Sequence, residues 1–339
     1  MAEGINELIA GIKAGRDLSR EQACGVFEQI LTGRVEPGTM GELLEALAAK
    51  GETVEEIAGA ADVMNEKVTR VRCDADCIDT CGTGGDGIST FNVSTTAALI
   101  AAAAGATVAK HGNRTNTRVS GSAEAIAQLG VNLDAPVAVL ERCLRECHVA
   151  FLYAPNLHPA MKYAGPVRKK LGIRTIFKLV GPLTNPAGAK RQVLGTSKPE
   201  FTELLAEVLA ARNATLAWVV NAHNGLCDLS ITGETRVTEV REGRVRTFTV
   251  HPNDVGFETA PLDALLVDSP QASAAAIRDI LSGKDQGPRR QHTLLNAAAA
   301  LVVAGLAANL QAAIGPATEA IDTGAAVAVL ERLAQTSKG

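Results

Sequence analysis

The chain has 339 residues and a formal net charge of −4, with 46% hydrophobic and 21% charged residues. This composition is typical of globular proteins and argues against a nucleic-acid partner, which would require clusters of basic residues. The most apolar stretch, residues 97–109, is too short to cross a bilayer, and the first residues lack the pattern of a signal peptide. We therefore expect a cytoplasmic protein that binds neither nucleic acid nor membranes.

Residues 1–72 carry helix signals only. The segment LSREQACGVFEQILTG begins with a capping box formed by Ser19 and Gln22, and TVEEIAGAADVMNEKV begins with one formed by Thr53 and Glu56. Between them, TMGELLEALAAKG has apolar residues at helical spacing. These signals predict a small all-helical N-terminal domain over residues 1–72.

From Ile78 onwards, strand patterns alternate with helix patterns. CIDTCGTGGDG reads as a strand that enters a glycine loop, VSTTAALIAAAAG as a helix, ATVAKHGNR as a strand, SAEAIAQLG as a helix and VAFLYAP as a strand. The residues from Arg289 to Leu333 read as helical. This alternation predicts an α/β domain over residues 73–339 with a mostly parallel central sheet flanked by helices.

The loop GTGGDGISTFNVST, residues 82–95, has the features of a phosphate site. Its glycines let the backbone approach a ligand, and their N–H groups can form an anion nest. The helix that follows, with Ser94 or Thr95 as the expected N-cap, offers a second anion site at its N-terminus. Two such sites within one loop suit a ligand that carries phosphates at two ends.

A second polar loop, KHGNRTNTRVSGSAE, follows the next predicted strand at the same edge of the sheet. The first loop formally matches the GxGxxG pattern of dinucleotide-binding folds, which place an acid after the second strand to bind a ribose diol. Here that strand ends in Lys110 and Arg114 instead. Cations at this position favour a further phosphate group over a ribose diol. The pair of loops therefore favours a phosphorylated sugar over a dinucleotide.

Several segments, in order, resemble the anthranilate phosphoribosyltransferase family: GTGGDGISTFNVST, KHGNR…SGSAE, HPAMKYAGPVRKKLGIRTIF, GPLTNPA and GPRRQHTLLNAAAALVVAG. The resemblance covers nearly the whole chain. It implies a fold related to the nucleoside phosphorylases, in which residues from about 166 to 188 join the helical domain, and a homodimer formed through that domain. The implied reaction moves phosphoribose from phosphoribosyl pyrophosphate (PRPP) to the amine of anthranilate in tryptophan biosynthesis, with Mg²⁺ as the metal.

The resemblance and the two loops together assign site residues. The expected PRPP site comprises Gly82, Gly85, Asp86, Thr90, Asn92, Val93, Ser94, Thr95, Lys110, His111, Gly112, Asn113, Arg114, Thr117, Arg118 and Ser122. Gly82, Asn113 and Arg168 are expected to contact anthranilate, Arg168 through the carboxylate, although a surface ion pair is the alternative for Arg168. Ser94 is implied to be a magnesium ligand. The reaction needs cations and fixed dipoles rather than a nucleophile, and no residue is assigned a catalytic role.

The chain departs from the family pattern at a metal position. The family carries a DGLDE-type segment whose Asp and Glu hold magnesium, whereas this chain has HNGLCDLS, with Cys227 and Asp228 at those positions. A thiol is a poor ligand for a hard cation. We expect one magnesium, held by Ser94, Asp228 and PRPP, and a weakened second site.

Other departures place Arg118, Tyr163 and Lys178 where the family has Ser, His and Asn. They leave two alternatives open: a transferase or phosphorylase of the same fold that acts on another aromatic acceptor, and a paralogue with an impaired metal site.

Overall fold

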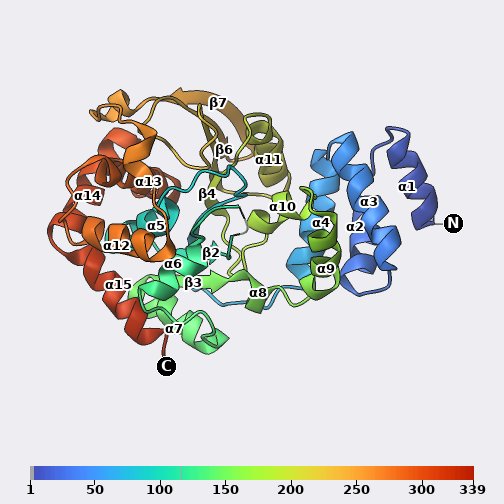
Figure 1. Ribbon diagram of the computed structural model, residues 1–339, viewed down its shortest axis with the longest axis horizontal. Helices are drawn as coiled ribbons and strands as arrows, with labels where there is room; N and C mark the ends of the chain where they lie inside the picture. Colours follow the sequence, from blue (N-terminus) through green and yellow to red (C-terminus); the bar gives the residue numbers. More distant parts are fainter. Residues whose placement is uncertain (1–3, 116) are drawn as a thin grey trace.

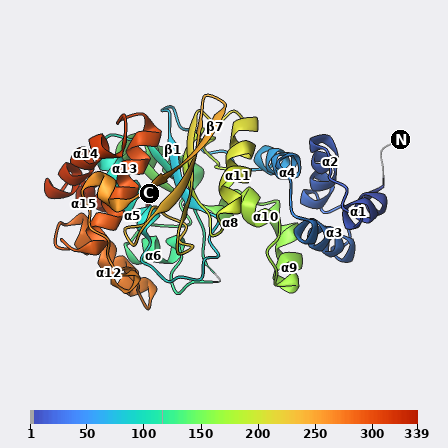
Figure 2. The ribbon, with the colours of Figure 1, turned by 90° about the horizontal axis from the view of Figure 1, so that it is seen from above.

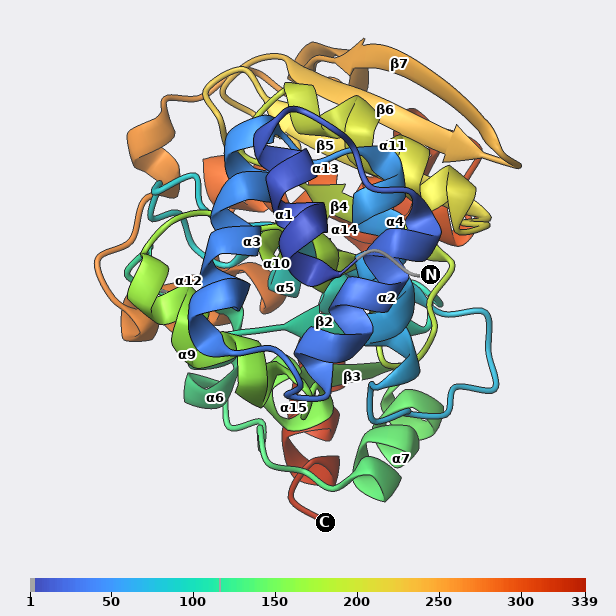
Figure 3. The ribbon, with the colours of Figure 1, turned by 90° about the vertical axis from the view of Figure 1, so that its right-hand side faces the viewer.

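The computed structural model describes residues 4–115 and 117–339. Figure 1 shows an elongated arrangement in which the N-terminal helices lie at one end and a larger body, built around a sheet, lies at the other. The remaining two views agree: the helical end projects from the body in Figure 2 and lies in front of it in Figure 3.

The N-terminal helices are α1 (Ile5–Lys13), α2 (Arg20–Leu31), α3 (Pro37–Lys50) and α4 (Val54–Glu66). Of these, α2 and α4 begin where the predicted capping boxes place them. The Ser19 hydroxyl accepts a hydrogen bond from the Gln22 amide at 3.2 Å, and the Glu56 carboxylate accepts one from the Thr53 amide at 2.9 Å. Both predicted capping boxes are present, so local chemistry sets these helix starts.

The sheet has seven strands in the order β3-β2-β1-β4-β5-β6-β7, and the first five are parallel while β6 and β7 pair antiparallel. The strands are β1 (Ile78–Gly82), β2 (Val108–Gly112), β3 (Val149–Tyr153), β4 (Arg191–Gly195), β5 (Leu216–Ala222), β6 (Thr235–Arg241) and β7 (Arg244–Val250). The predicted fold class, a small helical domain plus a mostly parallel sheet flanked by helices, is confirmed. The sequence reading missed β4, which pairs with β1 and sets Gly195 beside Gly82.

Helices cover both faces of the sheet. On one side α13 packs on α5, α14 and β4, whereas on the other side α11 packs on β5, β6 and α4. The body contains α5 (Val93–Ala103), α6 (Ser122–Gln128), α7 (Val137–Cys147), α8 (Ala154–Leu157), α9 (Met161–Leu171), α10 (Phe177–Val180), α11 (Glu200–Ala211), α12 (Pro270–Leu281), α13 (Pro288–Ala304), α14 (Leu310–Asp322) and α15 (Ala325–Thr336). Three short 3₁₀ helices span Gly181–Leu183, Pro252–Val255 and Leu262–Leu265. No helix in the described part of the chain is long and apolar enough to cross a membrane.

The α9–α10 segment joins the two ends of the molecule. Val167 of α9 belongs to the same buried cluster as the N-terminal helices, and Phe177 meets Phe27 edge to face with ring centroids 5.6 Å apart. Arg174 forms a bidentate ion pair with Glu52 at 2.9 and 2.8 Å. These contacts hold the segment, and with it any side chain that points toward the sheet edge, in one position.

Three buried histidines make the stability of the fold sensitive to acid. Burial lowers the pKa of His111 to about 3, of His158 to about 4 and of His292 to about 3. Unfolded rings take up a proton near pH 6.5, so below that pH the unfolded state binds more protons than the folded state. The free energy of unfolding should therefore decrease as the pH falls from about 6.5 to about 4, by up to about 1.4 kcal/mol per pH unit for each ring.

Urea denaturation at pH 7, 6 and 5 measures this dependence. Neither ring nitrogen of His292 has a hydrogen-bond partner among the described residues, so His292→Leu removes one titrating ring without removing a bond. The variant should show a flatter pH dependence than the wild type. An unchanged dependence would mean that His292 is protonated equally in both states.

Candidate active site at the carboxyl edge of the sheet

The glycine loop leaves β1 at Gly82 and enters α5 at Val93. Gly84, Gly85 and Gly87 have φ angles of 62°, 88° and 70°, a region that side chains other than glycine rarely adopt. The loop conformation thus requires these glycines, as the phosphate-site interpretation expects. Thr83 continues the pairing beyond the strand, because its amide donates to the Gly195 carbonyl at 2.8 Å.

The prediction of Ser94 or Thr95 as the N-cap of α5 is wrong. The cap is Asn92, whose carbonyl already accepts hydrogen bonds from the amides of Thr95 and Thr96. The Asn92 side chain is engaged elsewhere: its Oδ1 accepts hydrogen bonds from the hydroxyls of Ser120 and Ser273, both at 2.8 Å. Asn92 therefore ties the glycine loop to the second loop, a tertiary role that sequence spacing does not reveal.

Lys110 lies beneath the glycine loop rather than on the surface. Its Nζ donates to the Thr80 carbonyl at 2.5 Å, and burial lowers its pKa. Asp79 is buried beside it and accepts hydrogen bonds from the His111 amide at 3.0 Å and from the Asn185 side chain at 2.8 Å. Burial raises the pKa of Asp79, whereas the nearby Lys110 lowers it. Asp79 and Asn185 were missed by the sequence reading, although an acid inside an apolar strand was a signal.

In the second loop, KHGNRTNTRVSGSAE, some predicted site residues lie near the glycine loop and others make contacts away from it. Asn113 and Ser122 close it, since the Asn113 amide donates to Ser122 Oγ at 3.3 Å and that hydroxyl donates to the Asn113 carbonyl at 3.2 Å. Arg114 is exposed and its Nε donates to the Tyr153 hydroxyl at 2.9 Å. Thr117 is also exposed. Of the predicted residues of this loop, Arg118 is the one that reaches across to the glycine loop.

Arg118 and Asp86 form a bidentate ion pair between the two loops. One of its hydrogen bonds, from Arg118 Nε to Asp86 Oδ1, measures 2.6 Å, and the Asp86 side chain is completely buried. The Cys227 amide also donates to Asp86, at 3.4 Å. The cavity beneath has a volume of about 10 Å³, room for roughly one water molecule. A cavity of this size does not admit a ligand as large as PRPP.

Ser94 and Asp228 line that cavity together, with Thr80 and Asn296. Burial raises the pKa of Asp228 to about 6, against the lowering effect of Arg118 and Lys110. No described residue donates a hydrogen bond to the Asp228 carboxylate, so a buried charge remains without a partner. A serine hydroxyl and a carboxylate are oxygen ligands of the kind that Mg²⁺ prefers, and these two residues fit that ion.

Cys227 lines the same cavity but does not fit the ion. Burial raises the pKa of its thiol to about 12, and a sulfur atom is a poor ligand for Mg²⁺. Gly195, opposite, has no room for a side chain, because a Cβ there would collide with the Cys227 carbonyl. The strand β4 thus sets where the Cys227–Asp228 turn lies.

The α9–α10 segment carries the cations Arg168 and Lys178, of which Lys178 contacts the glycine loop. Arg168 stacks on Phe177, with its guanidinium carbon 5.5 Å from the ring centroid, and burial lowers its pKa. Lys178 is half-buried and its Nζ lies against Gly85, where an added Cβ would collide with it. Neither side chain has a hydrogen bond or an ion pair to any described residue. The alternative of a surface ion pair for Arg168 is not supported.

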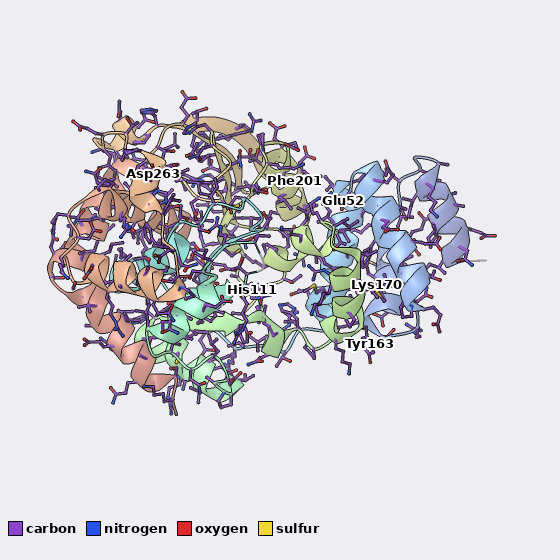
Figure 4. All side chains as sticks on the ribbon, in the orientation of Figure 1. Glu52, His111, Tyr163, Lys170, Phe201 and Asp263 are labelled. Carbon is purple, nitrogen blue, oxygen red and sulfur yellow. The ribbon has the colours of Figure 1, made fainter. Side chains whose placement is uncertain are left out.

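Tyr163 does not face the site. Its ring packs on Gly33, at the end of α2, and its side chain is partly exposed. Figure 4 shows Tyr163 and Lys170 on the helical flank, apart from His111 in the body. The His111 and His158 rings are in contact, with their Nε2 atoms 3.0 Å apart.

Two family models match the chain. The helical bundle domain of a glycosyl transferase family matches residues 6–68, and the α/β domain of a glycosyl transferase family matches residues 74–327. Curated relatives named anthranilate phosphoribosyltransferase are similar over almost the whole length. One from Chloroflexus aggregans is 47% identical over 99% of both chains, and one from an Anaeromyxobacter strain is 49% identical over 97% of both.

Solved structures agree with these relatives. An anthranilate phosphoribosyltransferase from Thermus thermophilus superposes with a TM-score of 0.92 at 39% identity, covering 98% of this chain and 99% of that one. The Saccharomyces cerevisiae enzyme in complex with PRPP and Mg gives 0.83 at 27% identity, covering 94% and 92%. The same yeast enzyme in complex with 4-fluoroanthranilate gives 0.87 at 26% identity, covering 99% of both chains.

Proposed function

The chain belongs to the anthranilate phosphoribosyltransferase family, and on that premise we propose how its own residues share the work of the reaction. The protein transfers the phosphoribosyl group of PRPP to the amine of anthranilate and releases pyrophosphate. A C–N bond forms at C1 of the ribose while the bond from C1 to the pyrophosphate oxygen breaks. Positive charge develops on the sugar and negative charge on the leaving group, so catalysis depends on where fixed charges and dipoles lie.

In this proposal the glycine loop provides the phosphate site. The conformation of this loop is the observation that carries the proposal. Gly84, Gly85 and Gly87 adopt a left-handed backbone that lets N–H groups point toward a ligand, and α5 begins directly after the loop. Thr90 and Thr95 have buried hydroxyls without a partner among the described residues. These groups are ready to bind phosphate oxygens once the two loops separate.

Ser94 and Asp228 would hold Mg²⁺, the metal with which the yeast relative was solved. That ion neutralises charge on the phosphates when it is bound. Lys110, whose Nζ donates to the Thr80 carbonyl, lies near Asp228 and acts to lower the pKa of that carboxyl. The ion and Lys110 together would balance the charge of the leaving group at this end of the loop.

Arg168 would bind the carboxylate of anthranilate, and Asn113 and Gly82 would contact the ring and amine from the opposite side. A guanidinium presents paired N–H groups that match a carboxylate, which fixes the orientation of the acceptor. The amine of anthranilate is neutral, so it attacks C1 without prior removal of a proton. This agrees with the low pKa of His111 and His158, which makes both of them weak bases.

Fluorescence of anthranilate tests the proposal. Purified protein with PRPP and Mg²⁺ should consume anthranilate, and the signal should stay constant when PRPP is left out. If calorimetry shows PRPP binding while anthranilate is not consumed, the acceptor is another aromatic compound. If PRPP itself fails to bind with Mg²⁺ present, the metal site is impaired and the proposed function is wrong.

We also propose that the protein is a homodimer formed through its helical end and that it acts in the cytoplasm. In support, Tyr163 and Ile173, two of the exposed large apolar residues, both lie on or next to α9, which packs on α2 and α3. Light scattering should give a mass of about twice the 35.1 kDa of one chain. Cell fractionation tests the location.

A further inference from the structure

Cys227, Arg118 and Lys178 lie far apart in the sequence but meet at one end of the glycine loop. In the structure, Arg118 binds Asp86, the Cys227 amide binds the same Asp86, and Lys178 Nζ lies against Gly85. The thiol-bearing residue and the two cations thus surround the same two residues of the loop.

The side chains at this end of the loop favour an anion over a divalent ion. A carboxylate at position 227 would attract a divalent ion, whereas a thiol is a soft group that leaves such an ion without its ligand. Arg118 forms a neutral pair with Asp86, but Lys178 has no anionic partner among the described residues. One positive charge therefore faces the loop without compensation.

We infer that Lys178 and Arg118 bind the diphosphate of PRPP directly and replace, at the Cys227 end of the loop, the divalent ion that an acid would hold there. The inference rests on the proposed function, because it concerns the same site. Lys178 donates hydrogen bonds from its ammonium group, beside Gly85, to the diphosphate oxygens. Arg118 exchanges the Asp86 carboxylate for phosphate oxygens, which have the same bidentate geometry. The exchange also separates the two loops and opens the cavity beneath them.

The geometry explains why the two cations belong together. Lys178 reaches the loop from α10, on the side of the helical bundle, whereas Arg118 reaches it from the second loop, on the side of α6. A diphosphate placed over Gly85 and Asp86 would lie between them. Each cation alone would contact only one side of the diphosphate. Both are therefore required to balance the negative charge that a single divalent ion would otherwise neutralise.

Calorimetry with inorganic pyrophosphate tests the inference without any acceptor and without turnover. In buffer with EDTA, the wild type should bind pyrophosphate, and Lys178→Met should bind it about 10- to 100-fold more weakly, the cost of one hydrogen bond to a charged group. Arg118→Ser should weaken binding by a similar factor. Lys170→Met, which removes the same charge from an exposed position of α9, should bind like the wild type.

Cys227→Asp provides the converse test. An acid at this position would pair with Lys178 and restore a metal ligand, so pyrophosphate binding should weaken in EDTA and recover when Mg²⁺ is added. Unchanged dependence on Mg²⁺ in this variant would contradict the inference. Lys178→Arg, which keeps the charge, should retain metal-free binding, and circular dichroism would show that each variant is folded.

The outcomes separate this inference from the proposed function. If the wild type binds pyrophosphate only with Mg²⁺, or if Lys178→Met binds as tightly as Lys170→Met in EDTA, the cations do not replace the ion and the inference is wrong while the transferase function stands. If metal-free binding depends on Lys178 but anthranilate is not consumed, the inference holds and the acceptor assignment is wrong.

Discussion

Asp228→Asn should reduce kcat/KM for the transfer by at least about 100-fold, the usual cost of removing one group that stabilises developing charge. The carboxylate lines the cavity with Ser94, and no described residue donates a hydrogen bond to it. An amide has nearly the same shape but no negative charge, so the variant should require much more Mg²⁺. A titration of activity against Mg²⁺, with PRPP saturating, measures the shift.

The same substitution should stabilise the fold. Burial raises the pKa of Asp228 to about 6, so the folded state holds its proton more tightly than the unfolded state does. The free energy of unfolding therefore decreases as the pH rises from about 4 to about 6, and at neutral pH the ionised carboxylate costs about 3 kcal/mol. Asp228→Asn removes this cost, and its melting temperature in EDTA at pH 7 should rise by several degrees.

Both effects together identify a residue that is kept for function at the expense of stability. Asp263→Asn is a suitable control, because Asp263 is an exposed acid in the 3₁₀ helix Leu262–Leu265 and its carboxylate has no hydrogen bond or ion pair to any described residue. It should change neither property. A lower melting temperature for Asp228→Asn would show that the fold itself uses the carboxylate, and the metal assignment would then be wrong.

Arg168→Met should reduce kcat/KM for anthranilate by about 100- to 1000-fold. The guanidinium is positioned by Phe177 and has no partner among the described residues, so the loss corresponds to two charge-assisted hydrogen bonds to the carboxylate. Binding of PRPP should remain the same, because the proposal assigns the phosphates to the two loops and not to Arg168. Steady-state kinetics with each substrate varied in turn separate the two effects.

Two variants control this result. Lys169→Met, the exposed neighbour of Arg168 on α9, should be close to wild type. Arg168→Lys should restore only part of the rate, since an ammonium group cannot make the paired hydrogen bonds of a guanidinium. Equal losses of affinity for PRPP and for anthranilate in Arg168→Met would instead indicate that Arg168 holds the α9–α10 segment in place.

Much of the candidate site could be predicted from the sequence because its signals are local. Gly84, Gly85 and Gly87 have positive φ angles, which the glycine-rich sequence of the loop itself permits, and the capping boxes at Ser19 and Thr53 need only three residues of spacing. The alternation of strand and helix patterns predicted a parallel sheet in the same way. Strand β4 was missed because its pattern is short and begins with two polar residues.

The sequence by itself determined the loop, the fold class and the residue types available for phosphate, carboxylate and metal. Only the tertiary structure decided how they combine: that Arg118 pairs with Asp86, that Asn92 is bound by Ser120 and Ser273, and that Lys178 lies against Gly85. The physical reason is that these pairs join segments from tens to more than a hundred residues apart. Which charge finds a partner, and which remains free for a ligand, depends on the packing of the whole chain.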